Sequence, residues 1–157
     1  MIPGGKDQPT LFQPPTLFFD EKKSDVLPLS SPTAEETPRI FPTPACTDNL
    51  RFIEDLTIPD GTNTQPGEFL DKRWLVENAG SCNWSEDYRV KLVSGPAMGV
   101  PEEQALYPAR SGTQAVIRMI FVIPKESGLL RSAWQAYNPN GEAFGDPFFI
   151  EVLVQSP

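Results

Sequence analysis

Short segments of alternating apolar and polar residues, separated by turn residues, most restrict how this 157-residue chain can fold. In residues 68–78, Leu70, Trp74 and Val76 fall on one side and charged residues on the other, which is the spacing of a half-buried strand. No segment of ten or more residues has a convincing helical period. We therefore predict an all-β sandwich. Its further strands are expected at residues 88–93, 105–107, 114–123, 129–137 and 147–154.

Lys72 interrupts the apolar side of residues 68–78. We expect it to lie near the start of its strand, where the ammonium group can reach water along the side-chain stem.

Proline divides the chain into two parts. Nine of its 18 prolines lie before residue 45. Because proline disfavours both helix and central strand, residues 1–45 are predicted to be an extended arm or linker. Residues 46–157 are predicted to be the folded domain.

The arm carries a small apolar repeat. Pro-Thr-Leu-Phe occurs at residues 9–12 and again, with one more phenylalanine, at residues 15–19. The plainer interpretation is incidental hydrophobicity. The sharper one is that the segment docks on its own domain, on a second copy or on a partner, for instance as a strand added to a sheet edge. Its docking residues would be Leu11, Phe12, Leu17, Phe18 and Phe19.

Charge argues against two classes of partner. The net charge is −8 and no dense basic patch occurs, so nucleic acid and anionic membranes are not expected as partners. No apolar run approaches the roughly 20 residues of a membrane span, and residues 1–5 lack the apolar stretch of a signal peptide. We expect no direct membrane insertion.

Few residues offer catalysis or metal binding. The chain has no histidine, which excludes Ser-His-Asp and Cys-His nucleophiles. The carboxylate pairs Glu86-Asp87 and Glu102-Glu103 lie in predicted loops, where solvated charge is the simpler interpretation. Two cysteines alone make a poor zinc site, and Asp60 lacks the ligand series of a calcium loop. We expect no enzyme, no cofactor and no metal.

Residues 46–154 resemble a four-tryptophan (FW) domain. This is the immunoglobulin-like module at the centre of the autophagy receptor called the neighbour of the breast-cancer gene, and it also occurs in bacterial proteins. The resemblance implies an immunoglobulin-like β-sandwich of about seven strands that recognises a protein or peptide. The matching elements are Asp60-Gly61-Thr62, Pro66-Gly67, Lys72-x-Trp74-x-Val76-x-Asn78-x-Gly80, Trp84, Gly95-x-x-Met98, Gly128 with Trp134, and Phe144-Gly145 before residues 148–150.

The family aromatics fall on Trp74, Trp84 and Trp134, and the fourth tryptophan is replaced by Phe149, which has no N–H donor. We expect Trp74 and Trp134 to fill the core. For Trp84, core packing and ligand contact both remain open. Phe149 should be half exposed and form a surface patch with Leu153.

Bacterial members that this chain resembles often follow a Ser/Thr/Pro-rich stalk and carry a cysteine pair near Cys46 and Cys82. The resemblance implies a Cys46–Cys82 disulfide and an exported, cell-surface location, with any signal or anchor outside this sequence. The alternative is two buried thiols in a cytoplasmic protein. We expect a non-catalytic protein-binding or scaffold module, in which the arm could mediate self-association. A structural spacer and a carbohydrate-binding sandwich are the alternatives.

Overall fold

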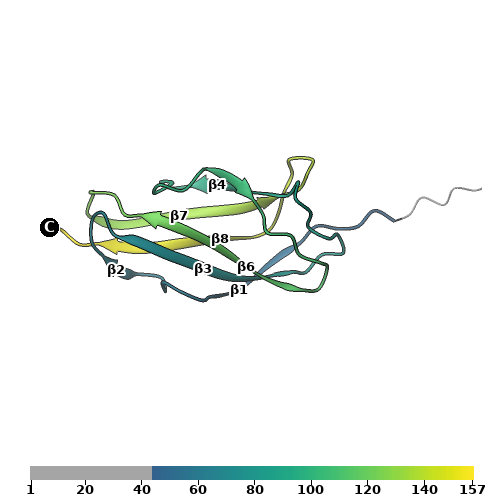
Figure 1. Cartoon of the computed structure of the whole chain (residues 1–157), viewed down its shortest axis with the longest axis horizontal. Coiled ribbons are helices and arrows are strands. Elements are labelled where there is room, and N and C mark those ends of the chain that lie inside the picture. Colours follow the sequence, from purple (N-terminus) through teal and green to yellow (C-terminus); the bar gives the residue numbers. More distant parts are fainter. Residues whose placement is uncertain (1–43) are drawn as a thin grey trace, which may run out of the picture. The chain divides into compact units, whose positions relative to one another are not determined.

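A computed structural model describes residues 44–157, and that part of the chain forms eight strands and no helix. The prediction of an immunoglobulin-like all-β sandwich is confirmed, with one strand more than the seven expected (Figure 1). The strands are β1 (Leu50–Asp55), β2 (Thr62–Thr64), β3 (Phe69–Asn78), β4 (Arg89–Ser94), β5 (Glu103–Ala105), β6 (Gln114–Val122), β7 (Gly128–Tyr137) and β8 (Ala143–Val154).

The strands form two sheets. The smaller sheet has the order β1-β3-β6, and the larger has the order β2-β8-β7-β4-β5. All pairs are antiparallel except β2 with β8. Strand β6 therefore ends one sheet, and the short strand β5 ends the other.

Tryptophan and phenylalanine side chains fill the space between the sheets. The Trp74 ring lies 5.0 Å from that of Phe148 and 6.2 Å from that of Phe121, centroid to centroid. Phe121 in turn packs on Trp134 at 6.3 Å. Alternation produces this core, because every second residue of β3 and β6 points inward.

Two glycines allow neighbouring backbone segments to approach closely. A Cβ on Gly145 would lie 2.4 Å from the backbone nitrogen of Leu50, and one on Gly95 would lie 1.9 Å from the carbonyl oxygen of Arg131. Both glycines have positive φ, at 71° and 81°. Side chains at either position would require the backbone to move.

Two local expectations were wrong. The short strand predicted at residues 105–107 lies at Glu103–Ala105, although the N–H of Leu106 still donates to the carbonyl of Tyr88. Lys72 does not reach water, because its side chain is fully buried. Its ammonium donates to Asp55 Oδ1 at 2.6 Å and to the carbonyl of Ile58 at 2.7 Å, so it ties β1 and the following turn to β3.

The buried ion pair yields an asymmetric prediction. Asp55→Asn leaves a charge in the core, whereas Lys72→Met leaves a carboxylate that is partly exposed to water. We expect Asp55→Asn to lower the free energy of unfolding by about 1 kcal/mol or more beyond Lys72→Met. Urea titrations of both variants and of the double variant test this. Equal costs would contradict the stabilising role given to Asp55.

The indoles also differ in a testable way. Trp74 Nε1 donates to the carbonyl oxygen of Phe149 at 2.8 Å, whereas Trp84 Nε1 has no partner within residues 44–157. Trp74→Phe strands a carbonyl and Trp84→Phe strands nothing. We expect Trp74→Phe to cost about 1–3 kcal/mol more than its matched control Trp84→Phe, measured by chemical denaturation. A smaller difference would mean that water replaces the lost donor.

Candidate functional site

The three tryptophans of the family pattern are internal. Trp74 and Trp134 have no exposed surface, and Trp84 is 2% exposed. Trp134 Nε1 donates to Ser132 Oγ at 3.0 Å, while Trp84 packs on Phe144 at a ring separation of 6.1 Å. None of these indoles is available to contact a ligand in this conformation.

Phe149 and Leu153 lie on the outer face of the larger sheet. Phe149 is partly buried, and the Arg131 guanidinium lies 3.6 Å from its ring centroid. Leu153 is 39% exposed and pairs with Leu129, which is 63% exposed. The exposed apolar part of this patch is therefore the Leu129–Leu153 pair, because the arginine covers the phenylalanine ring. Its role as a docking surface stays a prediction.

The disulfide between Cys46 and Cys82 is present. It ties the start of the domain to the turn before Trp84, and the carbonyl of Thr47 accepts the N–H groups of both Ser81 and Cys82 alongside it. A Cβ on Gly80 would lie 2.3 Å from that carbonyl oxygen, so the two segments are in close contact. The predicted docking residues Leu11, Phe12, Leu17, Phe18 and Phe19 lie outside the described residues.

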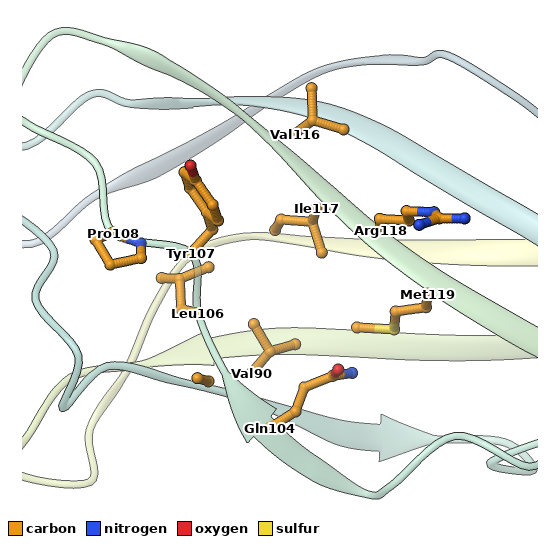
Figure 2. A pocket seen from close by; sticks show the side chains of 10 residues that line it. Val90, Gln104, Leu106, Tyr107, Pro108, Val116, Ile117, Arg118 and Met119 are labelled. Carbon is orange, nitrogen blue, oxygen red and sulfur yellow. The ribbon is translucent and has the colours of Figure 1, made fainter.

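The structure brings together a groove that sequence analysis missed. It has a volume of about 290 Å³ and lies between β6 of one sheet and the segment Gln104–Pro108 of the other (Figure 2). Figure 2 shows the side chains of the two sheets facing each other across this space. We call it the edge groove. Its lining comprises Val90, residues 104–108 and residues 116–119.

The groove wall is apolar and partly open to solvent. Tyr107 is 67% exposed, and Val116 and Ile120 on the outer side of β6 are 42% and 49% exposed. A shallower depression continues from Tyr107 over the outer face of β6 to Leu75 and Arg73. Exposed apolar groups gathered along one strand are typical of an interaction surface.

Strand β6 also presents unused backbone groups. The ladder with β3 is bracketed by hydrogen bonds from Asn78 N to Thr113 O and from Ile123 N to Glu68 O. Antiparallel pairing alternates, so the N–H and C=O groups of Val116, Arg118 and Ile120 point away from β3. Val122 follows the same rule, and its N–H donates to the carbonyl of Met98. Within the described part, no backbone group pairs with the N–H of the three earlier residues.

One polar group inside the groove lacks a partner. Gln104 Nε2 is shielded from solvent and makes no hydrogen bond to any residue that the structure describes. An unpaired buried donor costs about 1–3 kcal/mol. A carbonyl oxygen of a bound chain would satisfy this donor.

The outer rim of the groove carries a positive excess. Arg118 donates to Asp71 from Nε at 2.8 Å and from Nη2 at 3.1 Å, and Arg73 donates to the same carboxylate at 2.8 Å. Hydrogen bonds first from Arg118 and then from Arg73 lower the pKa of Asp71 to about 2. Asp71 is therefore ionised near neutral pH, and two guanidiniums share one carboxylate.

The sequence held one signal for this site. Residues 115–122 are apolar on both faces of the strand, since Val116, Ile120 and Val122 point outward and Ile117 and Phe121 inward. Outward apolar residues on a strand indicate either a second layer or a binding surface.

The carboxylates weighed for catalysis lie at the surface. Glu86, Asp87, Glu102 and Glu103 are all exposed, and Glu103 lies 3.5 Å from the Lys91 ammonium. In residues 44–157, no three metal-ligating side chains cluster, and no helix has the length and apolarity to cross a membrane.

Comparison with known proteins adds the family. The model of the Ig-like domain from next to BRCA1 gene matches residues 57–154, more than half of the chain. The chain belongs to this family. The human Next to BRCA1 gene 1 protein is 27% identical over 122 residues, which cover 73% of this chain and 12% of the human protein. Protein ILRUN of Danio rerio is 24% identical over 112 residues, which cover 69% of this chain and 38% of that protein.

This member of the Ig-like family thus spans a minor part of the curated relatives it matches. A Niemann-Pick type C2 protein from the Japanese carpenter ant is similar in structure at a TM-score of 0.46 and 11% identity, covering 68% of this chain and 93% of the ant chain. At that score the likeness supports no conclusion about function.

The disulfide should contribute measurably to stability. It closes a loop with a sequence separation of 36, for which the chain-entropy model gives roughly 4 kcal/mol. We expect Cys46→Ser with Cys82→Ser to lower the free energy of unfolding by about 2–4 kcal/mol in denaturant titrations. The Thr47 hydrogen bonds remain in this variant, so the native fold should persist. Two titratable thiols in denatured, unreduced wild-type protein would contradict the bridge.

Proposed function

We propose that this chain is a non-catalytic protein-binding module that takes an extended peptide along β6. The proposal depends on two features at one edge of the sandwich: backbone groups that have no partner among residues 44–157, and an adjacent apolar groove. Strand addition uses both features, because the backbone supplies hydrogen bonds and pockets select alternate side chains. Membership of the Ig-like family agrees with this function.

The groove suits a peptide better than a small substrate. Its volume of about 290 Å³ is at the lower limit of ligand pockets, which span about 300–1,000 Å³. It has room for one or two side chains, and the strand beside it has three backbone positions without a partner in the described part of the chain. A carbohydrate-binding surface has less support, since Tyr107 stands alone beside the groove rather than in a row of exposed aromatic rings.

We also propose that the module is exported and displayed at a cell surface, as a bacterial-type member of the family. A disulfide in a small domain and a proline-rich N-terminal stretch support this location, because disulfides persist in oxidising compartments. A structural spacer remains the second candidate function. It would use the same disulfide and stalk but leave the edge groove without a ligand.

A displayed library of random 12-residue peptides tests the binding function. The bait is the full chain carrying Leu17→Ser, Phe18→Ser and Phe19→Ser, which removes the apolar arm cluster as a competitor. We expect enriched peptides to alternate apolar residues and to lose about tenfold or more affinity when Ile120→Asp is introduced.

The matched control is Val93→Asp, an exposed apolar position on β4 of the opposite sheet. It should leave affinity unchanged. Failure to enrich any peptide, or equal losses in the two variants, would favour the spacer over the binding module.

A further inference from the structure

Resting on the proposed groove function, we infer that the peptide bound along β6 carries an aspartate or glutamate opposite Arg118, with apolar residues at the two positions on either side of it. The arginine binds this carboxylate on the outer face of the sheet, and the edge groove takes a neighbouring apolar side chain. The partner is therefore an extended segment with one acidic residue inside a short apolar run.

The backbone of β6 determines which surface each peptide residue meets. The N–H and C=O groups that point away from β3 belong to Val116, Arg118 and Ile120, whose side chains lie on the outer face of the sheet. A strand that pairs with these groups continues the sheet, so the peptide residue opposite Arg118 also lies on the outer face. Its two neighbours in the peptide point the other way, toward the space between the sheets.

Those two neighbours meet the apolar lining of the edge groove. Leu106 and Met119 line the groove from opposite sheets and are 1% and 3% exposed (Figure 2). Apolar side chains that enter the groove leave water, which favours binding, whereas a charged side chain there would lose its hydration. The groove therefore selects apolar residues directly beside the acidic one.

The outer face selects apolar residues two positions away from the acidic one. Val116 and Ile120 lie two residues before and after Arg118, and they are 42% and 49% exposed. Side chains directly opposite each other in paired strands are in contact. Because both flanks of Arg118 are apolar, the same five-residue pattern fits a peptide that runs parallel or antiparallel to β6.

Positive charge is in excess at this point of the rim. Arg73 and Arg118 pair across β3 and β6, and both donate to the single carboxylate of Asp71. The other acidic residue of β3, Glu77, is paired with Arg51 on β1. Like charges directly opposite each other destabilise a strand pair. A second carboxylate beside Arg118 would balance the two guanidiniums.

Arg118 retains hydrogen-bond donors for that second carboxylate. A guanidinium has five N–H groups, and Arg118 reaches Asp71 from Nε at 2.8 Å and from Nη2 at 3.1 Å. Among the residues that the structure describes, none accepts a hydrogen bond from its Nη1. The side chain is also 55% exposed, so a peptide can reach it.

The net charge of the chain acts over a longer range than this contact. The chain carries −8, which repels an acidic peptide at a distance. Exposed charges are largely screened beyond about 8 Å at physiological ionic strength, whereas a carboxylate bound to Arg118 lies well within that length. The acidic preference should therefore show in which peptides stay bound rather than in fast association.

The random-peptide library and bait described above test this motif. We expect the enriched peptides to carry aspartate or glutamate between apolar residues, and Arg118→Gln in the bait to abolish the acidic preference. The matched control is Arg51→Gln, which changes the net charge equally at an exposed arginine of the same sheet and should keep the preference. Peptides without an acidic preference, or its loss in both variants, would overturn the inference.

A double-mutant cycle on one enriched peptide isolates the contact. Replacing its acidic residue by the corresponding amide should weaken binding to the bait about threefold or more, as followed by fluorescence anisotropy. The same replacement should have no effect on binding to the Arg118→Gln bait. Equal losses on the two baits would place the carboxylate elsewhere and contradict the assignment.

A charge reversal provides a second variant. Arg118→Glu should change the preference at the same peptide position from acidic residues to lysine and arginine. Asp71 keeps Arg73 as its partner in both variants, so we expect native thermal unfolding curves. Selection of acidic residues by the Arg118→Glu bait would overturn the inference.

The outcomes separate this inference from the proposed function. Peptides that depend on Ile120 but show no acidic preference leave the binding function standing and exclude the motif. A library that enriches no peptide excludes both.

Discussion

The hydrogen bond from the Trp74 indole to the carbonyl of Phe149 connects the two layers of the sandwich. Trp74 belongs to the middle strand of the smaller sheet, and Phe149 belongs to β8 in the larger one. Most sheet-to-sheet contact is apolar and non-directional. This bond adds a direction, because it fixes the position of β3 relative to β8 while Phe148 packs on the same indole.

The same bond explains why phenylalanine suffices at position 149, where the resemblance to the four-tryptophan domain implies a tryptophan. The structure uses the backbone carbonyl of Phe149, which any residue supplies, and the side chain points to the outer face beneath Arg131. Phenylalanine keeps an aromatic face for the guanidinium, a contact worth about 0.5–1 kcal/mol at an exposed site. The loss of the indole N–H donor therefore changes hydrogen bonding at the outer surface and leaves the packing of the core unchanged.

The two edges of the smaller sheet differ in how many contacts join them to the rest of the sandwich. On the β1 side, Phe52 N donates to Asp146 Oδ2, Gly145 touches the backbone of Leu50, and Lys72 holds Asp55 and the turn at Ile58. At the outer edge of β6, the backbone hydrogen bond made by described residues is the one from Val122 N–H to the carbonyl of Met98. The open stretch lies between that point and the turn before Gln114, which is where the edge groove is found.

The sequence predicted the features that depend on local alternation and failed where distant segments meet. The period-two spacing of Trp74 and Val76 predicted that both side chains point inward, and the short strands between turns predicted the all-β class. The burial of Lys72 was not predicted because its partner Asp55 lies 17 residues away on another strand. The residues around Lys72 in the sequence do not show that a carboxylate will pair with its ammonium. The groove was missed for the same reason. Tyr107 and Val116 line the same groove because β5 and β6 end their respective sheets on the same side. The alternation of apolar residues along a strand does not reveal the order of strands in a sheet.

An open strand edge with apolar flanks promotes aggregation through edge-to-edge pairing, and folded proteins seldom leave such an edge unprotected. Natural sheets protect such edges with charge, proline, bulges or a covering segment. Of the three β6 residues whose backbone groups lack a partner within residues 44–157, Arg118 alone is charged, and its guanidinium is already engaged with Asp71. Pro108 lies across the groove and does not interrupt β6 itself. A bare edge of this kind favours pairing with a further strand, which is the interaction on which the proposed peptide binding depends.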